Sequence, residues 1–469
     1  MSVRPVAGSA VPEPPVAPLA PAFATDGLAV LPALEQARRI REGELTSVAL
    51  VEHHLDRIAR HDGELASLVQ VWERSALRQA RAADRARARG AALGPFHGVP
   101  TAVKDHHFVR GARVGFGSRA FSWAWSPVDD GVVRSLRAAG FVLLGKTAMS
   151  EIGLLPITET AVHPPTRCAW DPSRTAGGSS GGAGAAVAAG LVPVAPGTDG
   201  AGSVRIPAAL NGLLGLKTTR GLIPLDADRI DVFGLSVVGP MARTVDDAAA
   251  LLDALCLPRH AHHRARSRDP LPRLRIGVVR TAPFGTLDPR WLARVDAAAA
   301  VLRDAGHLVE EHPCPQGSVA EFTPLYQHFL GRVPVPFPSR LEPTVRWFWT
   351  EGRKVPRARA MEIFRSFEAR GLQALDGVDL MLTPTTLGPP PEVGAYADLP
   401  PEAHFEAAAA LGTYTALMNV TGQPALTVPF GTADGLPVGV QLVGHQGRDA
   451  LLLAVARVLR GEGVDVEAS

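Results

Sequence analysis

Apolar positions recur at helical spacing near the start of the chain. Val48, Val51, Leu55 and Ile58 stand three or four positions apart, with mostly polar residues between them. The preceding segment 45–47 carries the hydroxyl side chains typical of a helix N-cap. The run from 73 to 89 is rich in Arg and Ala and has the composition of a second helix. The pattern predicts that the folded part opens with helices.

From Gly98 onward the pattern changes to short apolar runs that alternate with segments rich in glycine and alanine. Helices are predicted over 132–139, 183–190 and 289–305. Strands are predicted over 99–103, 141–144, 191–195, 274–279, 307–311, 379–383, 425–429 and 439–443. This alternation is typical of an α/β fold, in which a sheet is covered by helices on its faces.

Three segments lack such a pattern. Residues 1–25 are rich in Pro and Ala without a continuous apolar run, which predicts a disordered extension. Residues 258–272 hold Arg, His, Ser and Pro without periodicity, which indicates an exposed linker. Residues 315–375 are aromatic-rich, and we expect them to be irregular.

Composition narrows the class of protein. A chain of 469 residues with 46% apolar and 20% charged residues is neither a disordered chain nor a small disulfide scaffold. A formal charge of +2 gives little attraction for nucleic acid, and no run reaches the ~18 to 20 apolar residues of a membrane span. Cys168, Cys256 and Cys314 lie too far apart in the sequence for a disulfide framework or a cysteine-ligated metal site, so we expect a cytoplasmic protein. We also expect that it needs no metal and no cofactor.

Lysine is rare in this chain. Of the 48 basic residues only Lys104, Lys146, Lys217 and Lys354 are lysines, and the other 44 are arginines. A guanidinium stays charged at any physiological pH, whereas a buried amine can lose its proton. A retained lysine therefore indicates a position where arginine would not serve.

Two segments rich in glycine and serine, 176–183 and 197–208, are the densest candidates for chemistry. A dinucleotide-binding loop starting at Gly182 is excluded, because its third glycine is replaced and no strand precedes it. Gly178 to Gly182 formally matches the nucleophile elbow G-x-S-x-G with Ser180 as nucleophile, but the strand that this motif requires is missing from the pattern. A purely structural role in tight turns remains open.

A third interpretation combines both segments with a lysine. Lys104 ends the apolar run 98–103, where a side chain can point into a site and act as a neutral base for a serine. The peptide N–H groups of Gly200, Ala201, Gly202 and Ser203 could then stabilise the oxyanion of an acyl-transfer reaction.

With these residues in place, the sequence resembles the amidase signature family. Lys104 in Val-Lys-Asp matches the family lysine, Ser179 in Gly-Gly-Ser-Ser-Gly-Gly the bridging serine, and Ser203 in Gly-Ser-Val-Arg-Ile-Pro-Ala the nucleophile. Further segments match in family order: 145–153, 215–221, 239–247, 382–385 and 435–444. The resemblance covers about residues 26–460.

The resemblance implies a fold and a set of roles. It implies one domain over 26–469, with a mixed central β-sheet covered on both faces by helices. It implies a Ser, cis-Ser, Lys triad with a cis peptide before Ser179. Asp199 and Arg205 would brace the loop that carries the nucleophile, and Gly200, Ala201 and Gly202 would form the oxyanion hole.

Two departures from the family pattern bear on the substrate. Gly200-Ala201 replaces a larger residue and a glycine, and the added Cβ would cost about 1 kcal/mol if φ were positive there. His106 and His107 stand where the family commonly has Asn and an aliphatic residue, and they are candidate substrate contacts. The region 315–375 matches the family least, so we expect it to form the substrate side. Its candidate aromatic contacts are Phe322, Tyr326, Phe329, Trp347, Phe348 and Trp349.

The expected function is hydrolysis of a small-molecule carboxamide or N-acyl bond through a Ser203 acyl-enzyme. Two alternatives remain: an acyltransferase or esterase that uses the same acyl-enzyme, and a component of an amidotransferase assembly that works with partner chains. The amidotransferase subgroup usually has Gln where Ile206 stands, which disfavours the second alternative. The expected partner is a small-molecule amide substrate. We expect no binding to nucleic acid or to a membrane. A homodimer is one option for the oligomeric state.

Overall fold

The core of the molecule is a mixed sheet of eight strands. The computed structural model describes residues 19–24, 27–121, 123–225, 231–464 and 466. The strand order is β4-β6-β5-β10-β11-β9-β7-β8, in which β7 runs parallel to β8 and β9 and the other pairs are antiparallel. The strands are β4 (Val194–Asp199), β5 (Leu214–Lys217), β6 (Val237–Ala242), β7 (Arg275–Val278), β8 (Leu308–Glu311), β9 (Leu380–Pro384), β10 (Ala425–Ala433) and β11 (Leu436–Gly444). The expected mixed central sheet is confirmed.

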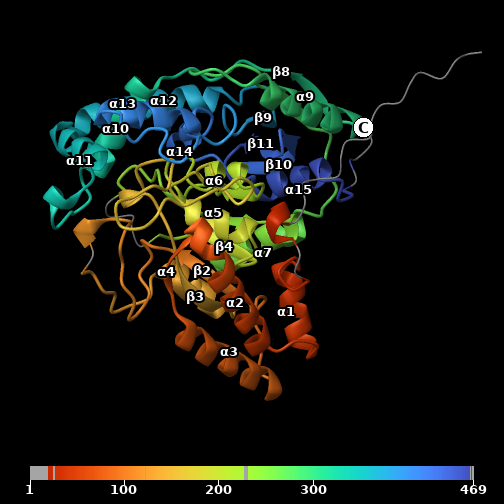
Figure 1. Cartoon of the computed structure of the whole chain (residues 1–469). Coiled ribbons are helices and arrows are strands. Elements are labelled where there is room, and N and C mark those ends of the chain that lie inside the picture. Colours follow the sequence, from red (N-terminus) through yellow and green to blue (C-terminus); the bar gives the residue numbers. More distant parts are fainter. Residues whose placement is uncertain (1–18, 25–26, 122, 226–230, 465, 467–469) are drawn as a thin grey trace, which may run out of the picture.

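Helices cover both faces of this sheet (Figure 1). The helices α7 (Val245–Leu255), α9 (Pro289–Asp304) and α15 (Asp449–Leu459) share one apolar core with strands β5, β10 and β11. The short helices α5 (Gly181–Ala188) and α6 (Arg205–Leu210) pack on the opposite face. Because α5 and α6 begin within the two Gly- and Ser-rich segments, the fold carries both segments to one edge of the sheet.

A second, three-stranded sheet was not expected from the sequence. It has the order β1-β3-β2 and consists of β1 (Leu68–Val71), β2 (Pro100–Lys104) and β3 (Val142–Thr147). The helices of this part are α1 (Ala33–Glu42), α2 (Ser47–Leu65), α3 (Glu73–Ala88) and α4 (Gly131–Ala138). The hydroxyl of Thr101 in β2 donates to the carbonyl of Val194 in β4 at 2.8 Å, which joins the two sheets. At the other end of the same two strands, Nζ of Lys104 in β2 lies 3.0 Å from Oγ1 of Thr198 in β4.

The prediction that 315–375 is irregular is wrong. The segment forms α10 (Val319–Leu330), α11 (Pro343–Lys354) and α12 (Arg357–Gln373), which lie near α13 (Pro401–Ala409) and α14 (Ala416–Thr421) in Figure 1. Ser318 and Glu321 form a reciprocal capping box at the start of α10. The many prolines of this segment hid the helices, yet Pro343 and Pro356 stand at helix starts, where proline is well tolerated.

Two other expectations need correction. Of the extension 1–25, residues 1–18 and 25 lie outside the described residues, but Leu19, Ala20 and Phe23 are buried around the short helix η1 (Pro21–Phe23). The linker 258–272 is mostly exposed, as expected, yet it contains η4 (Pro258–His260) and α8 (His263–Arg266). The remaining short helices are η2 (Arg119–Phe121), η3 (Glu151–Gly153), η5 (Pro338–Arg340) and η6 (Ala410–Gly412).

The other predicted elements are present with shifted ends. The strand expected over 191–195 begins only at Val194 and continues to Asp199, which brings its end to the Gly-rich loop. In the part of the chain that the structure describes, no helix has both the length and the apolar character needed to cross a bilayer. The assignment of 26–469 to one domain stays a prediction.

Candidate active site

Lys104 lies at the centre of a cluster of hydroxyl groups. It is the last residue of β2, and 1% of it is exposed. Its Nζ lies 2.8 Å from Oγ of Ser179, 2.8 Å from Oγ of Ser180 and 3.0 Å from Oγ1 of Thr198. Ser179 and Ser180 precede α5, and Thr198 belongs to β4, so two separate segments converge on this amine.

The environment of Lys104 favours its neutral form. Burial lowers the pKa of the Lys104 amine to about 7, and the charge of Asp199 opposes this shift only in part. At neutral pH a large fraction of Lys104 is therefore unprotonated. A neutral amine has a lone pair that can accept a proton from a neighbouring hydroxyl, whereas an ammonium group cannot.

The segment around Ser179 has the backbone that the family resemblance implies. The peptide bond between Gly178 and Ser179 is cis. Among the described residues just before it, only isolated bridges occur at Arg174 and Thr175, so the strand of a nucleophile elbow is missing. The alternative nucleophile, Ser180, is fully buried.

The Gly-rich loop after β4 is held by Asp199. Its Oδ1 accepts from the backbone N–H of Gly202 at 2.7 Å, and its Oδ2 accepts from that of Val204 at 3.2 Å. Burial alone would raise the pKa of the Asp199 carboxyl. The charge and hydrogen bonds of Arg205, the charge of Lys217 and a hydrogen bond from Asn419 instead hold this pKa well below its usual range. Asp199 is therefore a permanent anion under the loop.

Arg205 completes a buried network with residues from distant segments. Its Nε and Nη2 each donate to Asp199 at 2.9 Å, in the bidentate geometry that suits a carboxylate. Arg205 also donates to Oε1 of Gln441 at 2.9 Å and to Oδ1 of Asn419 at 2.7 Å. Asn419 in turn donates to the carbonyl of Asp199 at 2.7 Å. The structure thus brings Asp199 and Arg205 together under the loop, away from the cavities.

The loop offers fewer free N–H groups than the sequence suggested. Gly202 is removed from the expected oxyanion donors, because its N–H is bonded to Asp199. The N–H groups of Gly200, Ala201 and Ser203 have no partner in the described part of the chain. Ala201 is not among the described non-glycine residues with positive φ, so its Cβ causes no backbone strain.

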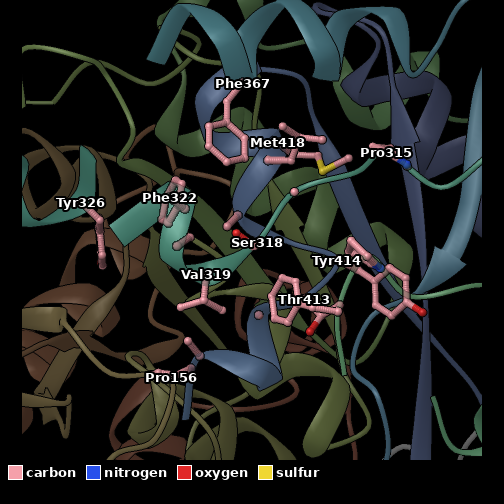
Figure 2. Close-up of a pocket in the computed structure, with 18 of the residues that line it drawn as sticks. Pro156, Pro315, Ser318, Val319, Phe322, Tyr326, Phe367, Thr413, Tyr414 and Met418 are labelled. Atoms are coloured by element: carbon pink, nitrogen blue, oxygen red, sulfur yellow. The ribbon is translucent and has the colours of Figure 1, made fainter. Parts of the chain in front are cut away.

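Two cavities meet at Ser203. The small cavity, of about 110 Å³, is shown in Figure 2 and is lined mainly by apolar side chains of α10, α12 and the region around α14. The large cavity, of about 650 Å³, contains Lys104 and Ser179 as well as Ser203. Ser203 and Tyr326 line both cavities, while Lys104 and Ser179 line only the large one. The structure therefore brings the three predicted catalytic side chains to one space.

The two candidate histidines have different surroundings. His106 lines the large cavity beside Lys104, and its buried Nδ1 has no hydrogen-bond partner among the described residues. Burial, with the charges of His107 and Lys104, holds the pKa of His106 well below its ordinary value, so its ring is neutral. His107 is buried, its Nδ1 bonds to Asp130 at 2.8 Å, and it lines neither of the two cavities at Ser203.

The candidate aromatic residues of 315–375 also fall into two groups: some line a cavity at Ser203 and the others do not. Phe348 lies in the core of the helical layer, Trp347 and Trp349 are partly buried against it, and none of the three lines either cavity, which corrects the expectation that they contact substrate. Phe348 is fully buried, because α11 turns this face toward the neighbouring helices. The cavities are instead lined by the α10 residues Phe322, Tyr326 and Phe329 and by Phe367 of α12.

Several residues at the site were missed by the sequence analysis. Thr198 carried a signal, since it stands directly before Asp199 in the Gly-rich segment. Gln441 lies in the family-like segment 435–444. Asn419 and Thr415, whose hydroxyl donates to the carbonyl of Ala201 at 2.6 Å, lie in no motif and could be found only from the structure.

The class of the protein follows from comparison with known families. Residues 49–453 match the family Amidase, so the chain belongs to the amidase family, whose members are the amidase signature enzymes. Its enzymatic class is therefore amidase.

Related proteins cover nearly the whole chain. The chain is 38% identical to AmiB2 of Mycobacterium bovis, which is named as a putative amidase, over 92% of this chain and 95% of that protein. It is 34% identical to one of the subunits of the glutamyl-tRNA(Gln) amidotransferase from Thioalkalivibrio sulfidiphilus, over 90% and 95%. A 6-aminohexanoate cyclic dimer hydrolase, solved with substrate, superposes with a TM-score of 0.83 at 31% identity, over 93% and 97%.

Proposed function

We propose that this amidase hydrolyses a small-molecule carboxamide or N-acyl bond through an acyl-enzyme on Ser203. The observation that carries the proposal is the contact of Lys104 with Ser179. A buried amine with a pKa of about 7 lies 2.8 Å from a hydroxyl that shares a cavity with Ser203. These groups have the chemistry of a base, a proton carrier and a nucleophile.

In the proposed reaction, Ser203 Oγ attacks the amide carbonyl carbon. Its proton passes to Ser179 Oγ, whose own proton passes to Lys104 Nζ. The N–H groups of Gly200, Ala201 and Ser203 stabilise the oxyanion that forms. The same carriers then return the proton to the leaving nitrogen, the C–N bond breaks, and water releases the acid from Ser203 by the reverse route.

The two cavities suggest how the substrate is oriented. The leaving nitrogen must receive its proton from Ser179 and Lys104, which line only the large cavity. We therefore assign the amine side of the substrate to the large cavity. The acyl group then enters the small cavity, where Phe322 and Phe367 supply an apolar surface.

The alternatives make different demands on the chain. An amidotransferase component works with partner chains, and a relative of that kind is 34% identical to this chain. Ile206 is buried and lines the small cavity, so it offers an apolar surface where that subgroup usually has a glutamine. Acyl transfer to an amine remains an alternative fate of the same acyl-enzyme. The three buried, unpaired cysteines suit the cytoplasmic location that we propose.

Replacing Asp199 with asparagine is expected to lower kcat/KM by about 100-fold, because a misplacement of ~1 Å at a reacting group has an effect of that size. The change also leaves the buried Arg205 unpaired, which should destabilise the fold by about 3 to 5 kcal/mol. Steady-state kinetics and chemical denaturation measure the two effects.

The matched control for this change is Asp56→Asn in α2. Asp56 pairs with Arg60 on the surface, where such pairs contribute about 0 to 1 kcal/mol. This variant should keep wild-type activity and stability. If Asp199→Asn behaved like Asp56→Asn, Asp199 would not brace the loop.

An aromatic acyl group should be preferred over a short aliphatic one. We expect kcat/KM for phenylacetamide to exceed that for acetamide by about 30- to 150-fold, because burying a ring in the small cavity adds ~2 to 3 kcal/mol of apolar contact. Both substrates release ammonia, so the comparison isolates the acyl side. Ammonia release under identical conditions measures both rates.

A pair of variants locates this preference. Ala409 lines the small cavity and Val335 lines the large one. Ala409→Phe should reduce the preference to less than about tenfold by occupying the space of the ring, whereas Val335→Phe should leave it unchanged. Equal kcat/KM for the two amides in the wild type would contradict the proposed acyl site.

A further inference from the structure

A third cavity, away from Ser203, is strongly basic. It has a volume of about 380 Å³ and lies where η4 and α8 meet the loop after β5 and the start of α15. Six of its lining residues are cationic or titratable to cations: Arg220, Arg259, His260, His262, His263 and Arg266. The proposed amidase reaction uses none of them.

Among the described residues, acidic partners pair with only two of these six side chains: Glu368 lies 4.0 Å from Arg220, and Asp253 lies 2.9 Å from His263. Asp449 is the carboxylate among the described residues that line the cavity, and it is buried. Its two oxygens accept from the backbone N–H of Thr219 at 2.8 Å and from the Thr219 hydroxyl at 2.5 Å. Asp449 is thus turned toward Thr219 and not toward the arginines.

Two of the arginines have free guanidinium N–H groups. Within the described residues, the side chain of Arg266 makes no hydrogen bond or ion pair. Arg259 donates only its Nε, to Nε2 of His260 at 3.0 Å, which leaves both Nη groups free. His263 bonds to Asp253 at 2.9 Å, and the ring of His262 has no partner in the described part of the chain. Arg259, Arg266 and His262 therefore have side-chain N–H groups without a protein acceptor among the described residues.

We propose that this basic cavity binds the phosphoryl groups of a small polyphosphate-bearing molecule. Guanidinium groups bind phosphate oxygens in a bidentate way, and like charges around a concave wall concentrate anions. The volume exceeds that of one phosphate group, so it suits a diphosphate or a larger phosphorylated molecule. A hollow site on a chain of net charge +2 favours a small molecule over a nucleic acid.

Arg259 and Arg266 are the residues with which to test this proposal. Arg220 is unsuitable, because it donates to the carbonyls of Gly234 at 2.8 Å and Asn419 at 2.7 Å. Asn419 holds Asp199, so a change at Arg220 would disturb the loop of the active site. Arg259 and Arg266 have no such link and are exposed.

The experiment is isothermal titration of the full chain with inorganic pyrophosphate at constant ionic strength. We expect Arg259→Glu with Arg266→Glu to weaken binding by about 30-fold or more, and Arg259→Gln with Arg266→Gln to weaken it by about tenfold. The matched control, Arg74→Glu with Arg78→Glu, makes the same charge change at exposed positions of α3 and should bind as the wild type does. All variants should retain amidase activity, which reports their folding and is independent of the proposed cavity.

Three results would overturn the proposal. The first is no binding of pyrophosphate to the wild type at millimolar concentration. The second is equal binding by the α3 control and both cavity variants, which would indicate nonspecific charge attraction. The third is binding of a single-stranded oligonucleotide without binding of pyrophosphate, which would assign the cavity to nucleic acid.

Discussion

Replacing Lys104 with methionine or arginine is expected to lower kcat/KM by about 10³- to 10⁴-fold, the size of effect associated with a general base. Methionine removes the amine, and arginine keeps a positive charge that cannot serve as a base. In the wild type, burial lowers the pKa of Lys104 to about 7, and only the neutral form acts. Activity should therefore rise as pH increases through about 7 and level off above it.

The chain provides a matched control for this variant. Lys217 in β5 is also fully buried, and burial together with the charge of Arg205 lowers its pKa to about 7. Lys217 donates to the carbonyl of Thr218 and lines neither cavity at Ser203. Lys217→Met should keep the rise of kcat/KM with pH. Loss of that rise in Lys217→Met, or near-normal activity in Lys104→Arg, would show that Lys104 is not the base.

Ser203→Ala is expected to have the largest effect, a loss of about 10⁵-fold or more in kcat, because it removes the atom that carries the acyl group. Ser180→Ala should cost only about tenfold. Ser180 is buried and contacts Lys104 at 2.8 Å, so its loss changes the surroundings of the base but leaves the nucleophile intact. Single-turnover kinetics on the preferred amide measures both variants.

The order of these two effects distinguishes the competing motifs. A nucleophile elbow assigns the covalent role to Ser180, so that interpretation expects the larger loss in Ser180→Ala. Thermal unfolding of both variants excludes a folding defect as the cause. A loss in Ser180→Ala as large as that in Ser203→Ala would contradict the assignment.

The scarcity of lysine pointed to buried positions, but it did not identify the proposed base. Lys104, Lys146 and Lys217 are all buried, while the fourth, Lys354, is exposed and pairs with Glu351. The chain therefore retains lysine chiefly where an amine must fit inside the protein. The scarcity of lysine alone does not separate the three buried lysines; the place of Lys104 at the end of the run 98–103 and its match to the family motif singled it out, and in the structure it lines the cavity of Ser203.

The sheet was predictable in outline, because its strands are short apolar runs with clear ends. The helices of 315–375 were not, since prolines at helix starts look the same in sequence as prolines in loops. The burial of Phe348 against the cavity-lining Tyr326 also follows from helix orientation, which the sequence left open.

Motif analysis found Asp199 and Arg205, but it did not show which distant residues complete the network under the loop. Asn419 bonds to Asp199 across 220 positions, and Gln441 bonds to Arg205 across 236. Neither partner stands beside a catalytic motif in the chain. Such contacts depend on how the fold brings β11 and Asn419 of α14 to Arg205, so they become visible only with the fold.

The central claim is that Ser203 carries the acyl group, and covalent trapping tests it most directly. The wild-type protein would be treated with a fluorophosphonate, digested, and its peptides mapped by mass spectrometry. We expect one modified residue, Ser203, and much slower labelling in Lys104→Met. Modification at Ser180 or Ser179 with Ser203 unmodified would contradict the account.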